Sequence, residues 1–380
     1  MSIDIMQDNK DLNNYFYVKY WVKSATTVQD AAFDIAVGQS IGNPSKRSVW
    51  ETPEMIERFC CKILRGPDLD KSEGFVEVAF PLVNIDWRTD GIAQLVCTIA
   101  GGNADIDRIL RFRALRIEFS DEFINKTFNR PKYGLSGFRQ LTGRHNKPLF
   151  GGIVKPKTGI TPHQLLEITK QLVDGGVDFI KEDEIMANPA VCRLEDRVEL
   201  ISNYIRDTKV VYCFCINADP VHVVPRARFV AENGGRGVHI NVWSGLGSYK
   251  SIRDADLPLF IHYQKSGDKV FTHKDNPFSV SWQLLCQLAT YCGVDTIHAG
   301  MWGGYLSDPE DELKETMKIL TDGNVTPALS CGLTADLIQP IVDKFGTNWL
   351  ANSGGGIHSD PNGTLAGARK IRNAVDLIST

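Results

Sequence analysis

Charged and polar residues stand at the ends of several apolar runs in this 380-residue chain. The first run ends with a lysine, and the second ends with a lysine and two acids. Histidines occur in two later runs, and serines and glycines follow the last two runs. Charged side chains are rarely buried unless they pair or bind a metal, so their recurrence indicates a site rather than a core. The residues are Lys155 and Lys157; Lys181, Asp183 and Glu184; His262 and His298; Ser330 and Gly332; and Ser353, Gly354, Gly355 and Gly356.

Each of these features also has an ordinary structural interpretation. The run KEDE (181–184) is typical of a solvated loop, but at the end of a buried strand its acids beside a lysine make an oxygen-rich site suited to Mg²⁺. His262 and His298 could each be core histidines, which is how we interpret His239. The run SGGG (353–356) could be a tight turn, but between a strand and a helix its N–H groups would bind phosphate.

The elements that must position these residues repeat from about residue 149. Short apolar runs recur as FGGIVK, DFIKED, VVYCFCIN, GVHINVW, LPLFIHY, TIHAG, TPALSCG and WLANSGG. Helical patterns follow most of them, at 161–175, 193–206, 219–233, 279–291, 308–321, 334–343 and 363–376. Near-continuous apolar strands are typical of parallel sheet buried on both faces. Eight such units predict a closed (β/α)₈ barrel with its active site at the carboxyl ends of the strands. An open, doubly wound sheet is the alternative.

The first part of the chain has a different pattern. Residues 16–24, 74–82 and 93–101 alternate as strands do, whereas 53–64 and 105–115 have helical spacing. This mixture predicts a smaller α+β domain over residues 1–130, ahead of a catalytic barrel domain over residues 131–380.

Composition excludes several classes of partner. The net charge of −4 gives no basic surface for nucleic acid or an anionic membrane, and no apolar run approaches the ~20 residues of a membrane helix. The nine cysteines are scattered and form no CxxC pair, which favours reduced, buried thiols. We therefore expect a cytoplasmic protein that acts on a small molecule.

Two stretches carry a resemblance to a known family. GGIVKPKTGITP (151–162) is followed by GGVDFIKEDE (175–184), which is similar to the metal-site signature GxDFxKxDE of the RuBisCO large-subunit superfamily. The phrases FIHY, TIHAG, ALSCG and NSGGG follow in the family's order. The resemblance covers essentially the whole chain and is to the RuBisCO-like proteins (form IV type), so it implies an α+β domain followed by a (β/α)₈ barrel.

The resemblance also implies roles for these residues. Lys181 resembles the lysine that CO₂ carbamylates, and with Asp183 and Glu184 it would then hold Mg²⁺, which stabilises an enediolate. Lys155 matches the family's proton-transferring lysine, and Lys157 would support the developing oxyanion. The other matches are His262 and His298 beside the substrate; Ser330, Gly332, Gly355 and Gly356 in a phosphate pocket; and Gln39 and Asn103, contributed by the N-terminal domain.

Two departures from the carboxylases bear on the substrate. In carboxylases the histidine of the fifth strand is followed by an arginine that binds the second phosphate, whereas Tyr263 follows His262 here. The loop after the sixth strand carries Tyr305 where carboxylases have a lysine that stabilises the added carboxylate. A phenol supplies no positive charge. We therefore predict a monophosphate substrate and no carboxylation of ribulose bisphosphate.

The resemblance then implies an Mg²⁺-dependent lyase or isomerase that forms an enediolate from a phosphorylated sugar-like substrate. Methionine-salvage enolases of the family take a base lysine from the N-terminal domain, and residues 99–107 contain none. We therefore favour a decarboxylase of a sugar-acid monophosphate. A methionine-salvage-type enolase or isomerase, and a non-catalytic regulatory relative, are the alternatives. The resemblance also implies a homodimer in which the N-terminal domain of one subunit completes the active site of the other.

Overall fold

The computed structural model describes residues 5–378, which form two compact units. Of the described residues, 5–128 and 268–288 form the first unit, and 129–267 and 289–378 form the second. The sequence-based division near residue 130 placed 268–288 with the barrel. These residues instead pack with the first unit, because their strand β11 (Phe278–Val280) extends its sheet.

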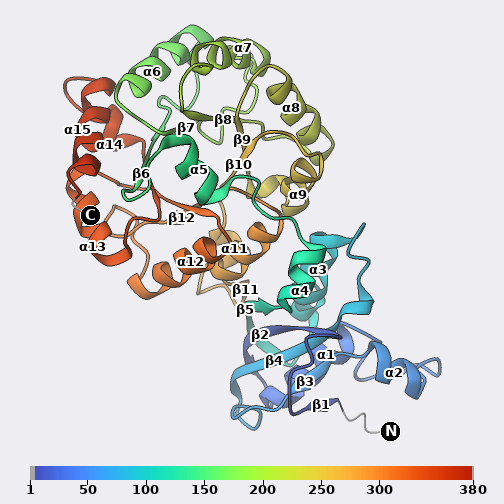
Figure 1. The fold of residues 1–380 in the computed structure, drawn as a ribbon. Helices are drawn as coiled ribbons and strands as arrows, with labels where there is room; N and C mark the ends of the chain where they lie inside the picture. The colour runs from blue at the N-terminus through green and yellow to red at the C-terminus, as the bar shows by residue number, and fades with distance from the viewer. Residues whose placement is uncertain (1–4, 379–380) are drawn as a thin grey trace. The chain divides into compact units, whose positions relative to one another are not determined.

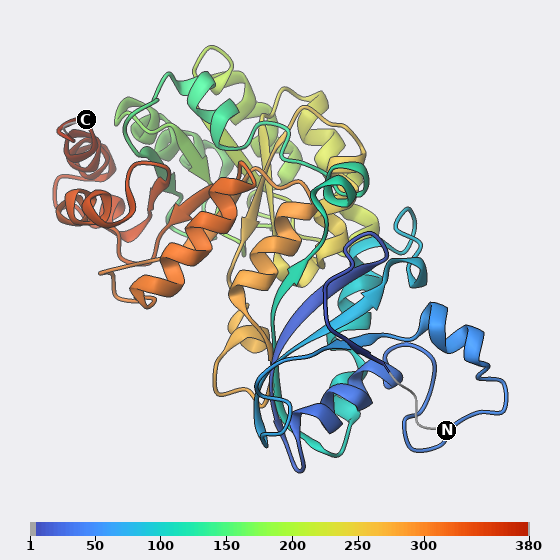
Figure 2. The same cartoon turned by 60° about the horizontal axis from the view of Figure 1, so that its bottom comes forward.

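The first unit is built on a six-stranded sheet (Figure 2). The long central strands β2 (Tyr15–Ser24), β4 (Glu73–Pro81) and β5 (Ile109–Glu118) run antiparallel. Buried residues alternate with more exposed ones along β5 and parts of β2 and β4, whereas residues 16–18 and 78–81 are buried without a break. The sheet order is β1 (Met6–Gln7), β3 (Lys62–Leu64), β4, β2, β5 and β11. The helices that accompany it are α1 (Val28–Gly38), α2 (Pro53–Phe59), α3 (Gly91–Ala100), α4 (Asp121–Thr127) and α10 (Lys269–Thr272), with short 3₁₀ turns η1 (Leu82–Asn84) and η2 (Gly102–Asp105).

Two predicted elements of this unit were wrong. Residues 93–101 belong to helix α3, since Ile92, Leu95 and Ile99 recur at helical spacing and are all buried. Residues 105–115 enter strand β5, in which Phe112 and Ala114 face the core while Arg111 and Arg113 face away from it. Both segments are short enough to carry either pattern, and pairing with β2 decides the second.

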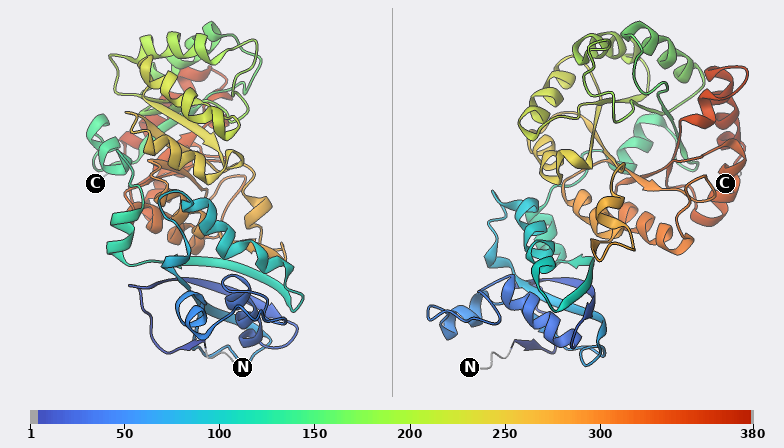
Figure 3. Two further views of the ribbon diagram at one scale, coloured as in Figure 1. Left: turned by 90° about the vertical axis from the view of Figure 1, so that its right-hand side faces the viewer. Right: turned by 180° about the vertical axis from the view of Figure 1, so that it is seen from behind.

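The second unit is a closed barrel of eight parallel strands (Figures 1 and 3). In chain order the strands are β6 (Leu149–Ile153), β7 (Phe179–Lys181), β8 (Val211–Cys215), β9 (Gly237–Asn241), β10 (Phe260–Gln264), β12 (Thr296–Gly300), β13 (Thr326–Leu329) and β14 (Leu350–Ser353). Each pairs with the next, and β14 closes the ring against β6. The predicted barrel is confirmed, and the open sheet is excluded.

Helices follow the barrel strands and lie outside the ring (Figure 3). They are α6 (Pro162–Asp174), α7 (Leu194–Ile205), α8 (Pro220–Glu232), α9 (Leu246–Asp254), α11 (Trp282–Tyr291), α12 (Glu310–Asp322), α13 (Ile338–Phe345), α14 (Gly355–His358) and α15 (Thr364–Asp376), with 3₁₀ turns η3 (Val242–Ser244) and η4 (Ala335–Leu337). Their bounds lie within four residues of the predicted ones. Residues 279–281, predicted as the start of a helix, lie in β11 or just before α11 instead.

Helix α5 (Gly134–Thr142) precedes the first barrel strand and contributes to the buried core of the barrel. Its Leu135 and Phe138 join Leu149, Phe179 and Phe260 in one apolar cluster. These residues come from the amino-terminal ends of their strands, so the carboxyl ends are left for polar side chains. Between residues 5 and 378, no helix is long and apolar enough to cross a membrane.

Candidate active site

A pocket of about 600 Å³ opens at the carboxyl ends of the barrel strands. Its lining comes from β6, β7, β10, β12, β13 and β14 and the loops that follow them, all within the second unit. The pocket brings together ten of the thirteen predicted site residues: Lys155, Lys157, Lys181, Asp183, Glu184, His298, Ser330, Gly332, Gly355 and Gly356. His262, Gln39 and Asn103 do not line it.

Lys181 ends strand β7 and is almost fully buried. Its Nζ lies 3.7 Å from Glu184 Oε2 and 3.2 Å from the carbonyl oxygen of Glu182. Burial lowers the pKa of the Lys181 ammonium, although the charges of Glu184 and Asp183 oppose this effect. Burial therefore favours the neutral amine, which is the form that can react with CO₂.

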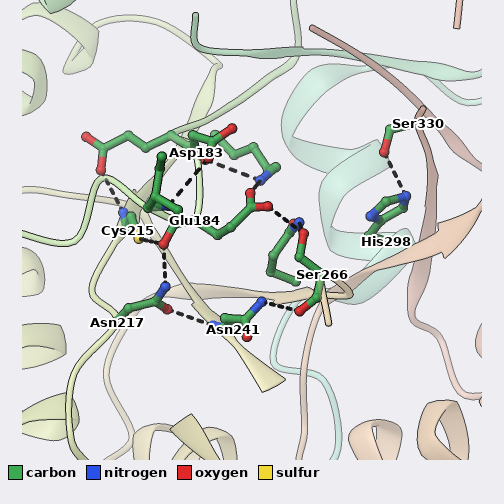
Figure 4. Close-up of polar contacts among 12 residues, drawn as sticks. Asp183, Glu184, Cys215, Asn217, Asn241, Ser266, His298 and Ser330 are labelled. Atoms are coloured by element: carbon green, nitrogen blue, oxygen red, sulfur yellow. Dashed lines mark hydrogen bonds and ion pairs between the residues drawn. The ribbon is translucent and has the colours of Figure 1, made fainter. Parts of the chain in front are cut away.

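The two carboxylates beside Lys181 are each held by a second group. Asp183 Oδ2 accepts a 2.7 Å ion-paired hydrogen bond from Lys155 Nζ. Glu184 Oε1 accepts a hydrogen bond from the uncharged Ser266 hydroxyl (Figure 4). Burial alone would raise the pKa of Glu184, but the charge of Lys181 and the bond from Ser266 lower it to about 2. Each carboxylate thus has one oxygen held by a neighbouring side chain.

Glu182, between these residues, has a role that the sequence did not reveal. Its side chain points to the opposite side of the strand and is fully buried, where it forms a 2.8 Å ion pair with Arg197 of α7. Tyr212 and the N–H of Cys215 also donate to its carboxylate. The period-two alternation of strand residues was the available signal, since it separates Glu182 from Lys181 and Asp183. This pair anchors the end of β7 to α7 and β8.

His298 of β12 meets Ser330, which directly follows the neighbouring strand β13. The Ser330 hydroxyl and His298 Nε2 are 2.8 Å apart. Burial, together with the charges of Lys265 and Lys181, lowers the pKa of His298 to about 3, so the ring is neutral at physiological pH. Neutral His298 can accept or donate one hydrogen bond without placing charge in the pocket.

Glycines follow both of the last two strands at the pocket. Gly332 has a φ of +105°, and a Cβ there would meet the backbone N of Tyr305 at 2.6 Å. A Cβ on Gly356 would lie 2.3 Å from the carbonyl oxygen of Leu333, whereas one on Gly355 would meet nothing within 4 Å. Gly332 and Gly356 are therefore required by close backbone approach, and Gly355 leaves space open to the pocket.

His262 was predicted to contact the substrate, but the structure places it below the pocket. It is fully buried beside His239 and Phe179, with ring centroids 6.1 and 5.6 Å away, and its nitrogens have no hydrogen-bond partner among residues 5–378. The strand continues one residue beyond the phrase FIHY, and Gln264, two positions after His262, is the residue of β10 that reaches the pocket.

This placement also corrects the comparison made at Tyr263. Tyr263 is buried outside the barrel lumen and stacks on Tyr249 of α9, with ring centroids 4.8 Å apart. The residue that follows the pocket-facing Gln264 is Lys265, whose charge acts on His298. A cation therefore directly follows strand β10, and the argument for a missing positive charge there does not hold.

Gln39 and Asn103 both belong to the first unit, where they lie at one corner. A Cβ on Gly102 would meet Gln39 Nε2 at 2.5 Å, so the Gln39 side chain lies against η2. Asn103 is fully buried and donates from Nδ2 to the carbonyl oxygen of Ile99. Gln39 is partly exposed, but Asn103 is enclosed by its own unit and is not presented to a ligand.

The donor set can be tested against a magnesium site. Within residues 5–378, no three His, Cys, Asp or Glu side chains gather as metal ligands. Asp183 and Glu184 supply two carboxylates of the hard oxygen type that Mg²⁺ prefers, and a carbamate on the buried Lys181 would supply a third oxygen donor between them. The residues fit Mg²⁺ provided that Lys181 is carbamylated.

Comparison with known proteins shows which protein family the chain resembles. Residues 134–379 match the family model of the ribulose bisphosphate carboxylase large chain, catalytic domain. The ribulose bisphosphate carboxylase of Pyrococcus furiosus is 30% identical, over 94% of this chain and 87% of that protein.

Two solved structures share the fold over most of their length. An octameric RuBisCO from Pyrococcus horikoshii OT3 has a TM-score of 0.88 and 26% identity, covering 98% of this chain and 90% of its own. A RuBisCO-like protein from Burkholderia fungorum has a TM-score of 0.83 and 26% identity, covering 96% of this chain and 94% of its own. The resemblance found in the sequence is confirmed, and the chain belongs to the RuBisCO large-chain family.

Proposed function

We propose that this chain is an Mg²⁺-dependent enzyme that forms an enediolate from a phosphorylated sugar-like compound, with carbamylated Lys181, Asp183 and Glu184 as the metal ligands. The observation that carries the proposal is their convergence with Lys155 in one pocket, whose opposite side is formed by backbone at Gly332 and Gly355. Charged groups gathered in this way are costly to bury, and a purely structural role would not need them.

Each pocket residue has a separate role in this proposed reaction. When bound, Mg²⁺ supplies positive charge that stabilises the enediolate oxygens. Lys155, on the pocket wall beside Asp183, moves the proton at the reacting carbon, and the more exposed Lys157 supports the oxyanion. Neutral His298 and Ser330 orient a substrate hydroxyl, and backbone N–H groups at the glycines bind phosphate.

Within this chemistry we favour decarboxylation of a sugar-acid monophosphate. Tyr305 supports this choice, because it lines the pocket where a carboxylase needs a cation. Its side chain is largely exposed, and desolvation together with the neighbouring Cys331 raises its pKa, so the phenol is neutral. A second candidate is carboxylation of ribulose bisphosphate. Lys265 favours it, because this cation at the end of β10 could bind a second phosphate, and the Pyrococcus furiosus relative carries that activity in its name.

One exchange experiment separates these candidates. The protein with Mg²⁺ and bicarbonate in D₂O would be given ketose and sugar-acid monophosphates, a methylthio-pentulose phosphate, and ribulose bisphosphate with labelled CO₂, each followed by NMR. We expect deuterium entry or carboxyl loss with one monophosphate, and loss of that reaction in Lys181→Ala. Labelled carboxylate in the bisphosphate product would instead establish carboxylation. Deuterium exchange only with the methylthio compound would indicate a salvage-type enolase or isomerase.

A non-catalytic relative is the remaining alternative. It predicts that no member of the panel reacts and that Mg²⁺ and bicarbonate bind no more tightly to the wild type than to Lys181→Ala. We also propose a homo-oligomer built from dimers with shared active sites, to which Gln39 of the partner chain contributes. The RuBisCO from Pyrococcus horikoshii is described as octameric, which supports assembly of this fold into oligomers.

A further inference from the structure

Four consecutive strands of the barrel are joined at their carboxyl ends by a closed ring of hydrogen bonds (Figure 4). Asn217, after β8, donates from Nδ2 to the carbonyl oxygen of Glu184 at 2.5 Å and accepts on Oδ1 from the N–H of Asn241 at 2.7 Å. Asn241, at the end of β9, donates from Nδ2 to the carbonyl oxygen of Ser266 at 2.7 Å. The Ser266 hydroxyl closes the ring by donating to Glu184 Oε1.

The neighbours of Ser266 fix the direction of the hydrogen bond between Ser266 and Glu184. Gln264 donates from Nε2 to Ser266 Oγ at 2.9 Å, so the single hydroxyl hydrogen of Ser266 is free to point at Glu184. A carboxylate can only accept at that position, which matches a Glu184 pKa far below neutral pH. Gln264 and Asn241 are both buried, so these bonds are shielded from competing water.

The ring leaves the two oxygens of Glu184 in different situations. Oε1 is occupied by Ser266, whereas Oε2 is the oxygen on the Lys181 side, 3.7 Å from Nζ. Because the backbone of Glu184 is also held, by Asn217, neither rotation of the side chain nor movement of the loop can easily exchange the two. Outer hydrogen bonds of this kind orient carboxylate ligands in metal sites.

We propose that Ser266, oriented by Gln264 and tied to the Asn217–Asn241 ring, is a positioning residue that presents Glu184 Oε2 to the metal ion. This inference rests on the proposed function, since it assumes that Glu184 is a metal ligand. It assigns to Ser266 a task that its small, uncharged side chain and its place beyond β10 do not reveal in the sequence.

The test is Mg²⁺ binding measured by calorimetry on the full-length protein in bicarbonate buffer. Removing an outer partner of a metal ligand typically costs about 10- to 100-fold in affinity, so we expect that loss in Ser266→Ala. Ser266→Thr keeps the hydroxyl and should bind as the wild type does. Ser202→Ala is the matched control, because Ser202 is buried in α7 outside the pocket and its Oγ has no hydrogen-bond partner among residues 5–378.

The outcomes are distinguishable. Wild-type affinity in Ser266→Ala, with the native circular dichroism spectrum, would overturn the positioning role while leaving the metal site intact. Gln264→Leu tests the same role if Ser266→Ala does not fold, since it frees the hydroxyl to rotate and should also weaken binding. If the wild type and Lys181→Ala bind Mg²⁺ equally, the proposed function fails and the inference fails with it.

Discussion

At the scale of single residues, Glu184 carries the clearest electrostatic signature. Lys181 and Ser266 hold its pKa near 2 in the folded chain, against an ordinary value of 4.5. A carboxyl whose pKa is depressed by folding stabilises the fold above its unfolded pKa, and that stabilisation is lost as pH falls through the folded pKa. The relevant window is therefore about pH 4.5 down to pH 2.

This shift gives a prediction for acid stability. Urea unfolding of the metal-free protein, compared with Glu184→Gln, should show the stability advantage of the wild type shrinking by about 2 kcal/mol between pH 6 and pH 3. The glutamine does not titrate, so it removes only this group's contribution. Parallel pH profiles for the two proteins would mean that Glu184 has an ordinary pKa and is not held by Lys181 and Ser266.

The place of the KEDE residues on the pocket could be predicted because their spacing fixes which side of the strand they face. Lys181 and Asp183 are two positions apart, and the structure places both on the pocket. His262 could not be placed in the same way, since nothing in FIHYQKS marks where the strand ends and the uncharged Gln264 gives no chemical signal. Asn103 follows two glycines, as exposed turn residues often do, yet tertiary packing buries it.

At the scale of elements, the segment after β14 makes a specific prediction about two adjacent glycines. Gly355→Ala places a methyl group where the structure leaves room, so the fold should be retained while the methyl narrows the pocket at the proposed phosphate site. Gly356→Ala forces a Cβ to within 2.3 Å of the Leu333 carbonyl oxygen, so it should destabilise the protein by about 1–3 kcal/mol.

Thermal unfolding and inorganic phosphate binding measure the two effects separately. We expect Gly355→Ala to keep the wild-type Tm and bind phosphate more weakly, and Gly356→Ala to lower the Tm. If both variants bind phosphate as the wild type does, the glycines serve only the turn.

The barrel strands could be predicted because parallel strands buried on both faces are nearly continuous apolar runs. Strand β11 could not, since it has only three residues and is formed through pairing with β5, a strand more than 150 residues earlier in the chain. For a similar reason, helix α3 was predicted as a strand and the start of strand β5 as a helix. Their apolar residues fit either period, and the long-range pairing that decides between them is absent from local sequence.

At the scale of the whole molecule, the pocket residues all come from the second unit, whereas Gln39 lies in the first. If active sites are shared between subunits, two differently impaired chains should complement each other. Mixing Lys181→Ala with Gln39→Ala after subunit exchange should restore up to about a quarter of the wild-type activity, because half of the dimers would be mixed and each would have one intact site. Activity that stays at the level of the separate variants would show that each chain works alone.

The most direct test of the central claim is whether CO₂ forms a carbamate on Lys181 when Mg²⁺ is present. The protein would be incubated with ¹³C-bicarbonate and Mg²⁺ and its ¹³C NMR spectrum compared with that of Lys181→Ala and of Lys209→Ala, a lysine outside the pocket. The account predicts a carbamate carbon signal that requires Mg²⁺, persists in Lys209→Ala and disappears in Lys181→Ala. A signal unchanged in Lys181→Ala, or none in a wild type saturated with Mg²⁺, would contradict it.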